Sequence, residues 1–351
     1  MNRILELDII RGMVIFLMVS FDAPPDHVYD IFLHAQWEGL TIEDLVFPGF
    51  VFAMGAAVAI SSSRKVISWK KILIRAGVLF LIGISLNAIV CFALYQDFAN
   101  LRILGILQRL ALTYVIGIAI TKFIKDDKKI FATALGLLAV SSIGFHLYSP
   151  ENSFDEMHNV SSAIDFIFLG VNHMLTPTHD PEGLYGTISS TSSMLFGFLA
   201  GRILIDELPK RDKILRLLIF GAILLILGGA WNYFDIIAKK LWTSPFALIT
   251  AGINLILMAI LMLMSYVKLS QKIFHPFVAL GKNPLFFFVA LNISLIILIG
   301  FEVWGKMFNV LQNFLPNSEL EFQVLIFCLI WAALWMLAAE ILDRLGIVIK
   351  L

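Results

Sequence analysis

The sequence predicts an all-α, polytopic membrane protein, and three observations lead to this prediction. Of its 351 residues, 59% are hydrophobic and only 15% are charged, whereas ordinary soluble domains carry roughly 25% charged residues. The mean hydropathy is +0.89. The apolar residues also fall in long blocks that contain no Asp, Glu, Lys or Arg, namely 45–63, 76–96, 241–267 and 284–301.

At roughly 20 residues per crossing, the apolar segments along the chain predict about ten transmembrane helices in a single transmembrane domain that covers residues 1–351. The first expected helix is the weakest, because Glu6, Asp8 and Arg11 lie near its start. The expected spans are 4–21, 45–63, 71–92, 101–120, 130–148, 184–204, 214–233, 241–267, 284–301 and 322–343.

The distribution of basic residues predicts the orientation of these spans. All but five of the 26 Lys and Arg residues fall in one set of loops and helix ends, and such loops are usually cytoplasmic. Both termini are therefore expected in the cytoplasm. Three loops then face the other side of the membrane, about 22–44, 149–185 and 302–321. Long connections of this kind are often functional.

Composition also limits the partners and cofactors that we expect. The formal net charge is zero, so no overall field favours nucleic acid, and membrane lipid is the expected surrounding. Cys91 and Cys328 lie in apolar spans and are interpreted as small buried residues rather than as a disulfide. His173 and His179 share an external loop, but their spacing matches no recognisable zinc site, and no metal is expected.

One polar stretch between two apolar blocks, residues 34–44, concentrates groups that can perform chemistry. It contains His34, an indole, a hydroxyl and three carboxylates. A histidine titrates near neutral pH and is suited to acid–base catalysis, although a hydrogen-bonded loop residue is the commoner role. Thr41 and Asp44 also resemble a capping box with Asp in place of Glu. The same residues could therefore simply begin the next helix.

Two arginines near or within the membrane also draw attention. Arg109 lies well inside the fourth expected span, where an ionisable side chain is costly and usually faces the bundle interior or a polar cavity. It could pair with an acidic neighbour such as Asp8, or it could bind an anion. Arg11 lies near the start of the first span and could equally be an interfacial residue that extends its charge to water.

The order of several motifs resembles the heparan-α-glucosaminide N-acetyltransferase family, a family of transmembrane acetyltransferases. The resemblance covers nearly the whole chain. The sequence is similar to a bacterial-type member of the family, which lacks the large lumenal domain that precedes the membrane region in the animal enzymes. The motifs are 7–12 (LDIIRG), 34–41 (HAQWEGLT), 44–48 (DLVFP), 101–103 (LRI), 105–110 (GILQRL), 169–173 (LGVNH), 180–183 (DPEG), 186–188 (GTI) and 240–243 (KLWT).

This resemblance implies transfer of an acetyl group from cytosolic acetyl-CoA to the amine of a terminal glucosamine on the far side of the membrane. It implies that His34 is catalytic, either as a general base or as an acetyl carrier. A family asparagine after the first span falls at or near Asp22 here, and an ionised Asp cannot donate the hydrogen bond that Asn would. The resemblance further implies a possible homodimer in a bacterial inner (cytoplasmic) membrane.

Further residues are expected to bind the two substrates. The phosphates of acetyl-CoA favour basic partners, and the candidates are Arg11, Arg102 and Arg109. Trp37 could stack on a sugar ring, and it could donate to the developing oxyanion, as could Asn172 or backbone N–H groups. The candidate residues for the amino sugar are Trp37, Glu38, Asn172, His173, Asp180 and Glu182.

Two other functions remain open at this point. Bacterial membrane O-acyltransferases of surface glycans share a similar Asp-x-x-Arg-Gly opening, which is present here at residues 8–12. A sugar transporter with an intramembrane polar site at Arg109 is a second alternative, although such transporters commonly show broken helices and internal repeats, and neither is clear in this sequence.

Overall fold

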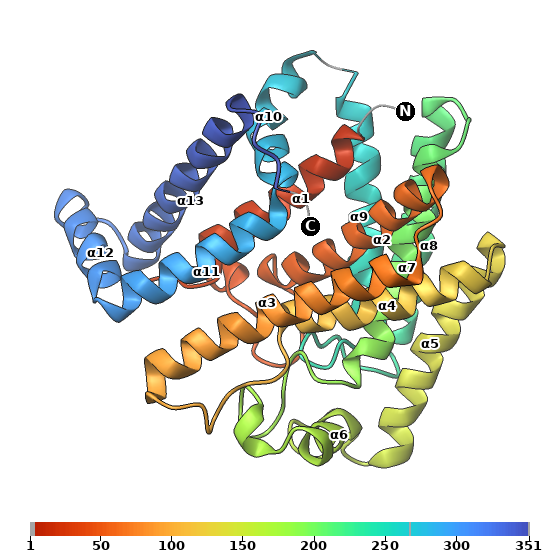
Figure 1. The fold of residues 1–351 in the computed structure, drawn as a ribbon, viewed down its shortest axis with the longest axis horizontal. Coiled ribbons are helices and arrows are strands. Elements are labelled where there is room, and N and C mark those ends of the chain that lie inside the picture. Colours follow the sequence, from red (N-terminus) through yellow and green to blue (C-terminus); the bar gives the residue numbers. More distant parts are fainter. Residues whose placement is uncertain (1–3, 267, 350–351) are drawn as a thin grey trace. The chain divides into compact units, whose positions relative to one another are not determined.

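The computed structural model describes residues 4–266 and 268–349, and the regular structure in this part of the chain is helical (Figure 1). The chain forms two compact units. The terminal unit consists of Met1–His34, Thr41–Val46 and Met264–Leu351, and the central unit consists of Ala35–Leu40 and Phe47–Leu263. Each unit is described by itself below.

Eight helices in the described residues are long and apolar enough to cross a membrane, and a bent pair raises this number to nine. The prediction of an all-α, polytopic membrane protein is therefore confirmed. The eight helices are α2 (Val46–Arg64), α3 (Trp69–Tyr95), α4 (Ile106–Phe123), α5 (Asp127–Tyr148), α7 (Gly186–Ile205), α8 (Lys210–Trp231), α9 (Ser244–Met264) and α13 (Leu320–Arg344).

The remaining two expected spans also form helices, but they are short. Helix α1 (Leu5–Phe21) and helix α11 (Pro284–Gly300) have 17 residues each, fewer than the roughly 20 of a full crossing. Helix α10 (Lys268–Lys282) precedes α11, and the chain bends by 77° between them. A proline at the first position of α11 is compatible with such a new helix start.

Close helix crossings organise the terminal unit. A Cβ atom on Gly12 of α1 would lie 1.8 Å from the Phe277 carbonyl oxygen, and one on Gly281 of α10 would lie 1.9 Å from the Asp8 carbonyl oxygen. Glycines at both positions let the two helix backbones approach each other, as is common between membrane helices. Helix α12 (Val303–Phe314) connects α11 to α13, as the blue end of the chain shows in Figure 1.

The central unit is held together around α7, which is buried along nearly its whole length. Glycines again permit contact between backbones, because a Cβ atom on Gly197 of α7 would lie 2.1 Å from the Phe52 carbonyl oxygen of α2. Buried hydroxyl groups on α7 then bond to α4 and α5. Ser190 lies 2.9 Å from Thr113, and Ser189 donates to Ser141 across 2.9 Å. Such bonds stabilise helix pairs where no water is present.

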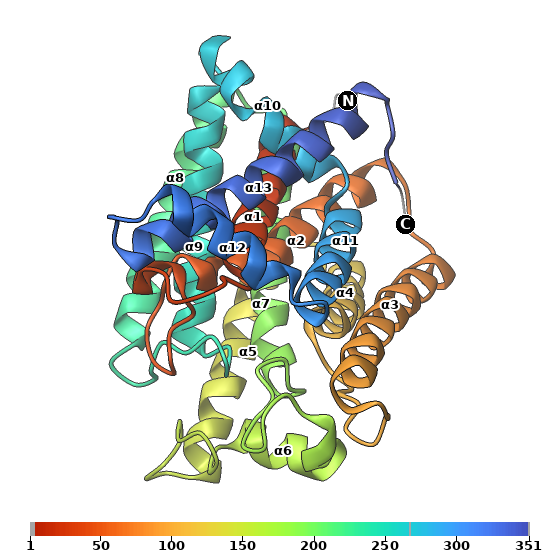
Figure 2. The same cartoon turned by 90° about the vertical axis from the view of Figure 1, so that its left-hand side faces the viewer.

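The loop after α5 folds into short helices. Helix α6 (Val160–Phe168) begins at Asn159, whose side chain accepts the Ser162 N–H, and η3 (Val171–His173) follows it. In both views α6 lies beside the C-terminal end of α5 (Figures 1 and 2). The other short helices are η1 (Asp30–Phe32) and η2 (Glu43–Leu45). Cys91 and Cys328 are buried and unbridged, as expected.

Candidate functional site

A histidine–carboxylate pair lies in the terminal unit, inside the polar stretch that the sequence singled out. His34 Nδ1 lies 2.9 Å from Asp44 Oδ1. The two side chains differ sharply in exposure, since that of His34 is 45% exposed and that of Asp44 only 1%. The imidazole is therefore open to a ligand, while the carboxylate that binds it is enclosed by the protein.

The second oxygen of Asp44 fixes the start of the following helix. Asp44 Oδ2 accepts the Thr41 backbone N–H across 3.1 Å and the Thr41 hydroxyl across 3.0 Å. The Asp44 N–H in turn donates to Thr41 Oγ1 across 3.4 Å. This reciprocal pattern is a capping box, so that interpretation is confirmed. The capping carboxylate is also the partner of His34, and sequence reasoning missed this second contact.

The arrangement has a chemical consequence for the imidazole. A carboxylate that accepts the Nδ1–H fixes the tautomer of a neutral histidine and places the basic lone pair on Nε2. It also stabilises the imidazolium that forms when Nε2 takes a proton. Because Asp44 is itself held by Thr41, the orientation of the His34 ring is set by the backbone geometry at the start of α2. The pair is thus equipped for proton transfer at Nε2.

The other two expected site residues of the terminal unit lie on α1. Asp22 is exposed at the C-terminal end of that helix, where its backbone N–H donates to the Met18 carbonyl oxygen. Arg11 Nη1 lies 3.3 Å from Asp8 Oδ1 on the preceding helical turn. Its side chain is 22% exposed. Arg11 thus pairs with Asp8 and remains partly accessible.

Trp37 belongs to the central unit, and its indole N–H, a predicted oxyanion donor, has a hydrogen-bond partner within the protein. The indole Nε1–H donates to the Phe154 carbonyl oxygen across 2.8 Å, so this donor is already used. The ring meets His179 edge-on at 5.0 Å, and the Lys240 ammonium lies 5.5 Å from its centre. Glu38, the next residue along the chain, is exposed.

Arg102, Asp180 and Glu182 form one ion cluster in the central unit. Arg102 donates to both oxygens of Asp180, at 3.0 and 2.7 Å, and to Glu182 Oε2 at 2.5 Å. Asp180 also accepts the backbone N–H groups of Leu175 and Glu182. Burial alone would raise the pKa of Asp180, but Arg102 outweighs burial and lowers it. These contacts hold the loop before α7 against the segment before α4.

His173 adds a further contact between the same two segments. Its Nδ1 lies 2.7 Å from the Leu101 carbonyl oxygen, and its own carbonyl oxygen accepts the Ile103 N–H across 3.1 Å. Its neighbour Asn172 is exposed on η3. His173 is thus bonded to the two residues that flank Arg102, and Asn172 remains accessible.

Arg109 is buried on α4, with 1% of its surface exposed. Its Nη2 donates to the Gly183 carbonyl oxygen across 2.7 Å, and the guanidinium lies 5.5 Å from the centre of the Trp242 ring. In the part of the chain that the structure describes, Nε and Nη1 have no hydrogen-bond partner. Asp8, the alternative partner considered above, binds Arg11.

Asp165 on α6 is a buried acid that the sequence did not single out. Its Oδ1 accepts the Leu184 N–H across 2.9 Å, and Oδ2 has no partner among the described residues. Burial raises the pKa of Asp165 to about 7, and the nearby Asp180 carboxylate adds to the increase. The only signal in the sequence that could have identified Asp165 was its position as a single acid among apolar residues of an amphipathic helix.

A basic pocket lies where α2, α4 and α7 end on the predicted cytoplasmic side. Its volume is about 250 Å³, and it is lined by Lys122, Lys125 and Arg202 together with Ser62 and other residues of the three helices. Lys125 Nζ donates to the Thr121 carbonyl oxygen, which places this ammonium at the C-terminal end of α4. Cations are favourable at such a helix end. Three basic residues thus line the pocket, and one of them, Arg202, also lies 3.5 Å from Asp127 Oδ1.

The fold and these side chains define an integral membrane protein with an exposed histidine that a buried carboxylate orients. The family model for the catalytic region of heparan-alpha-glucosaminide N-acetyltransferase matches residues 3–218. The chain belongs to this family, and the resemblance noted in the sequence is confirmed.

Two mammalian relatives extend the match to nearly the whole chain. The sequence is 27% identical to heparan-alpha-glucosaminide N-acetyltransferase of Mus musculus over 98% of this chain. It is 26% identical to the Homo sapiens protein of the same name over 97% of this chain. The chain spans about 60% of the length of these relatives.

Proposed function

We propose that this protein is a transmembrane acetyltransferase that moves an acetyl group from acetyl-CoA to the amine of a glucosamine-type sugar on the opposite side of the membrane. The observation that carries the proposal is the bond between exposed His34 and buried Asp44, at 2.9 Å. Acyl transfer to an amine requires a group that removes the amine proton. Family membership supports acetyl-CoA as the donor and an amino sugar as the acceptor.

The basic pocket suits the donor. Acetyl-CoA carries several phosphate groups, and charge-assisted hydrogen bonds from Lys and Arg bind phosphates well. Lys122, Lys125 and Arg202 line the pocket, and its hydroxyl groups can donate as well. We assign the phosphates of acetyl-CoA to this pocket. We propose that Arg109 binds the amide and thioester carbonyl groups of acetyl-CoA. These oxygens accept hydrogen bonds from N–H groups such as Nε and Nη1 of Arg109.

The reaction forms a C–N bond and breaks the C–S bond of the thioester. The amine nitrogen attacks the acetyl carbonyl carbon, His34 Nε2 takes the amine proton, and the coenzyme A thiolate leaves and accepts a proton from the His34 imidazolium. Asp44 stabilises that imidazolium. If His34 instead carries the acetyl group on Nε2, an acetyl-imidazole forms before the amine attacks. Rapid quenching without acceptor, followed by mass analysis of the His34 peptide, separates the two routes.

Exposure divides the acceptor candidates into two groups. Asp180 and Glu182 are buried and bound to Arg102, so we assign these three residues, with His173, to holding the loop before α7. Glu38 and Asn172 are exposed. We propose that they bind the amino sugar, Glu38 through its carboxylate and Asn172 through its amide.

The acceptor experiment separates this proposal from its rivals. Purified protein in vesicles is given acetyl-CoA and either glucosamine or glucose, and the products are identified by mass spectrometry. We expect acetylation of the amine of glucosamine and no acetylated glucose. Acetylated hydroxyl groups on both sugars would instead establish an O-acyltransferase. Uptake of labelled sugar without acetyl-CoA would establish a transporter.

The donor pocket makes a separate prediction. Lys125→Gln removes one of three cations, so we expect the KM for acetyl-CoA to rise about three- to tenfold, with kcat unchanged, as for a loss of uniform binding energy. Lys128→Gln is the matched control, because Lys128 is an exposed lysine in the first turn of α5, three residues further along the chain, and does not line the pocket. Equal KM values for the two variants would contradict the assignment.

A further inference from the structure

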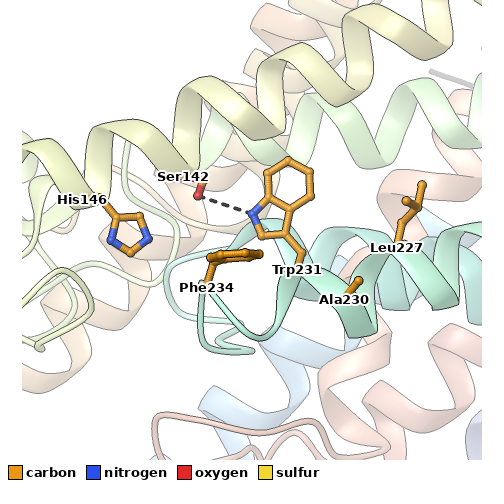
Figure 3. A pocket seen from close by; sticks show the side chains of 6 residues that line it. All are labelled: Ser142, His146, Leu227, Ala230, Trp231 and Phe234. Carbon is orange, nitrogen blue, oxygen red and sulfur yellow. Dashed lines mark hydrogen bonds between the residues drawn. The ribbon is translucent and has the colours of Figure 1, made fainter.

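An open groove lies between the ends of α5 and α8, away from the residues assigned above. Its volume is about 600 Å³, and it is lined by Ser142, His146, Leu227, Ala230, Trp231 and Phe234. Figure 3 shows His146 and Ser142 on α5 facing Trp231 and Phe234 across the groove. The Trp231 indole N–H lies 3.4 Å from the Ser142 hydroxyl.

The surroundings of the groove consist of exposed apolar side chains. Ile143 and Leu147 of α5, which flank His146, are 55% and 78% exposed, and Ile226 beside Leu227 is 70% exposed. Residues four apart on a helix share a face, so Ile143 and Leu147 form an apolar stripe next to Ser142 and His146. Exposed apolar side chains on membrane-spanning helices contact lipid tails. A lipid chain can therefore enter the groove from the side.

The polar end of the groove is formed by Ser142 and His146, which both bind the Asp235 carboxylate behind them. His146 Nε2 lies 2.9 Å from Asp235 Oδ1, and the Ser142 hydroxyl donates to the same oxygen across 2.8 Å. Ser153 lies 3.2 Å from His146 Nδ1. The Asp235 side chain is 1% exposed, and its Oδ2 has no partner in the described ranges 4–266 and 268–349. A buried acceptor of this kind is costly unless a donor reaches it.

The depth of this polar end matches the lipid headgroups. His146 lies two residues before the end of α5, and Trp231 is the last residue of α8. Tryptophan is enriched at the boundary between membrane and water. By the distribution of basic residues, this end of both helices faces the predicted external side. The site thus combines an apolar groove with a carboxylate near the predicted level of the outer headgroups.

We propose that this groove binds one aminophospholipid, phosphatidylethanolamine, with an acyl chain along Leu227, Ala230 and Phe234 and the ammonium group at Asp235. A primary ammonium has three N–H donors and can supply the bond that Asp235 Oδ2 lacks. The quaternary ammonium of phosphatidylcholine has no N–H group and cannot. The groove therefore distinguishes the two lipids by a hydrogen bond, and it does so independently of acetyl transfer.

Photolabelling tests this proposal on the whole protein. Purified protein is placed in nanodiscs that contain phosphatidylethanolamine or phosphatidylcholine with the same photoreactive acyl chain, and labelled peptides are mapped. We expect several-fold more label from phosphatidylethanolamine on residues 142–147 and 226–234. Equal labelling by the two lipids, or equal labelling of the exposed face of α3 around Leu81, would overturn the proposal.

Two variants separate the polar and apolar parts of the site. Asp235→Asn should bring the ratio of the two lipids close to one while the groove still takes label. Ala230→Trp fills the groove and should abolish labelling there by both lipids, and Ile219→Trp, at an exposed position of α8 outside the groove, is its control. Should Asp235→Asn fail to fold, the tryptophan pair decides: undiminished labelling of Ala230→Trp contradicts the site.

Discussion

Two histidine–aspartate pairs in predicted external loops look alike by distance and differ in everything else. His34 Nδ1 lies 2.9 Å from Asp44, and His158 Nδ1 lies 2.7 Å from Asp155. The Asp44 side chain is 1% exposed, whereas that of Asp155 is 46% exposed. The shorter contact thus belongs to the more exposed pair.

The difference lies in what holds the carboxylate. Asp155 accepts the backbone N–H groups of Met157 and His158 within the same turn, and the His158 bond together with these lowers the pKa of Asp155. That pair is a solvated turn. Asp44 instead has one oxygen on Thr41 and one on His34, which is ten residues away. Distance alone therefore does not separate the proposed catalytic pair from a solvated turn, whereas the burial of Asp44 and its hydrogen bonds to two residues do.

The largest expected effect comes from breaking this bond without removing the histidine. Asp44→Asn keeps the size of the side chain but no longer stabilises an imidazolium, so we expect kcat for acetyl transfer to fall about a hundred- to a thousandfold. Asp155→Asn makes the same change in the exposed pair and should leave kcat within about twofold. The two variants are compared by steady-state kinetics in the same vesicles. A similar loss in both would remove the distinction between the pairs.

A third carboxylate sharpens the comparison, because Asp165 is as buried as Asp44 but accepts a backbone N–H, that of Leu184, where Asp44 binds a histidine. Its pKa of about 7 lies above the ordinary value of 3.8. The native protein therefore binds more protons than the unfolded chain between about pH 4 and 7, and this group lowers stability as the pH rises through that window.

Asp165→Asn should remove this pH dependence. We expect the variant to be more stable than the parent protein by about 2 kcal/mol at pH 8, less than the roughly 4 kcal/mol of a full three-unit shift, because an amide replaces the carboxylate beside Arg109. At pH 4 the two proteins should differ little. Thermal unfolding in detergent across this range provides the measurement, and a stability gap that is the same at both pH values would refute the account.

The smallest effect is expected from loosening the carboxylate at its other end. Thr41→Ala removes the capping hydroxyl, which should cost about 1 kcal/mol of stability and lower kcat a few-fold, because the His34–Asp44 bond becomes less well oriented. Ser68→Ala is the matched control, since Ser68 caps α3 through the Lys71 N–H. It should lose a similar amount of stability and no activity. A Thr41→Ala enzyme with unchanged kcat would show that Asp44 needs no support from Thr41.

Much of the fold could be predicted from the sequence, because hydropathy and charge act locally along a membrane chain. The apolar blocks located eight helices of crossing length, and the exceptions, α1 and α11, are the two short ones. The capping box at Thr41 and Asp44 was also recognisable, since its residues are three apart. Each of these features depends on neighbours within a few helical turns.

The contacts that build the site were mostly beyond sequence reasoning, because they join distant segments. Arg102 reaches Asp180 across 78 residues, and the Trp37 indole reaches Phe154 across 117. Spacing could not show that Arg102 already binds two carboxylates or that the Trp37 N–H is occupied. Composition placed both near polar loops, and only the tertiary fold decides which partner each side chain meets.

One paired measurement tests the central claim most directly, namely the kcat for acetyl transfer from acetyl-CoA to glucosamine by His34→Ala and His158→Ala in the same vesicles. If the His34–Asp44 pair performs the proton transfer or carries the acetyl group, His34→Ala should lose about a hundredfold or more in kcat while it folds and inserts normally. His158→Ala should stay within about twofold of the parent protein. Near-normal turnover by His34→Ala, or an equal loss in both variants, would contradict the account.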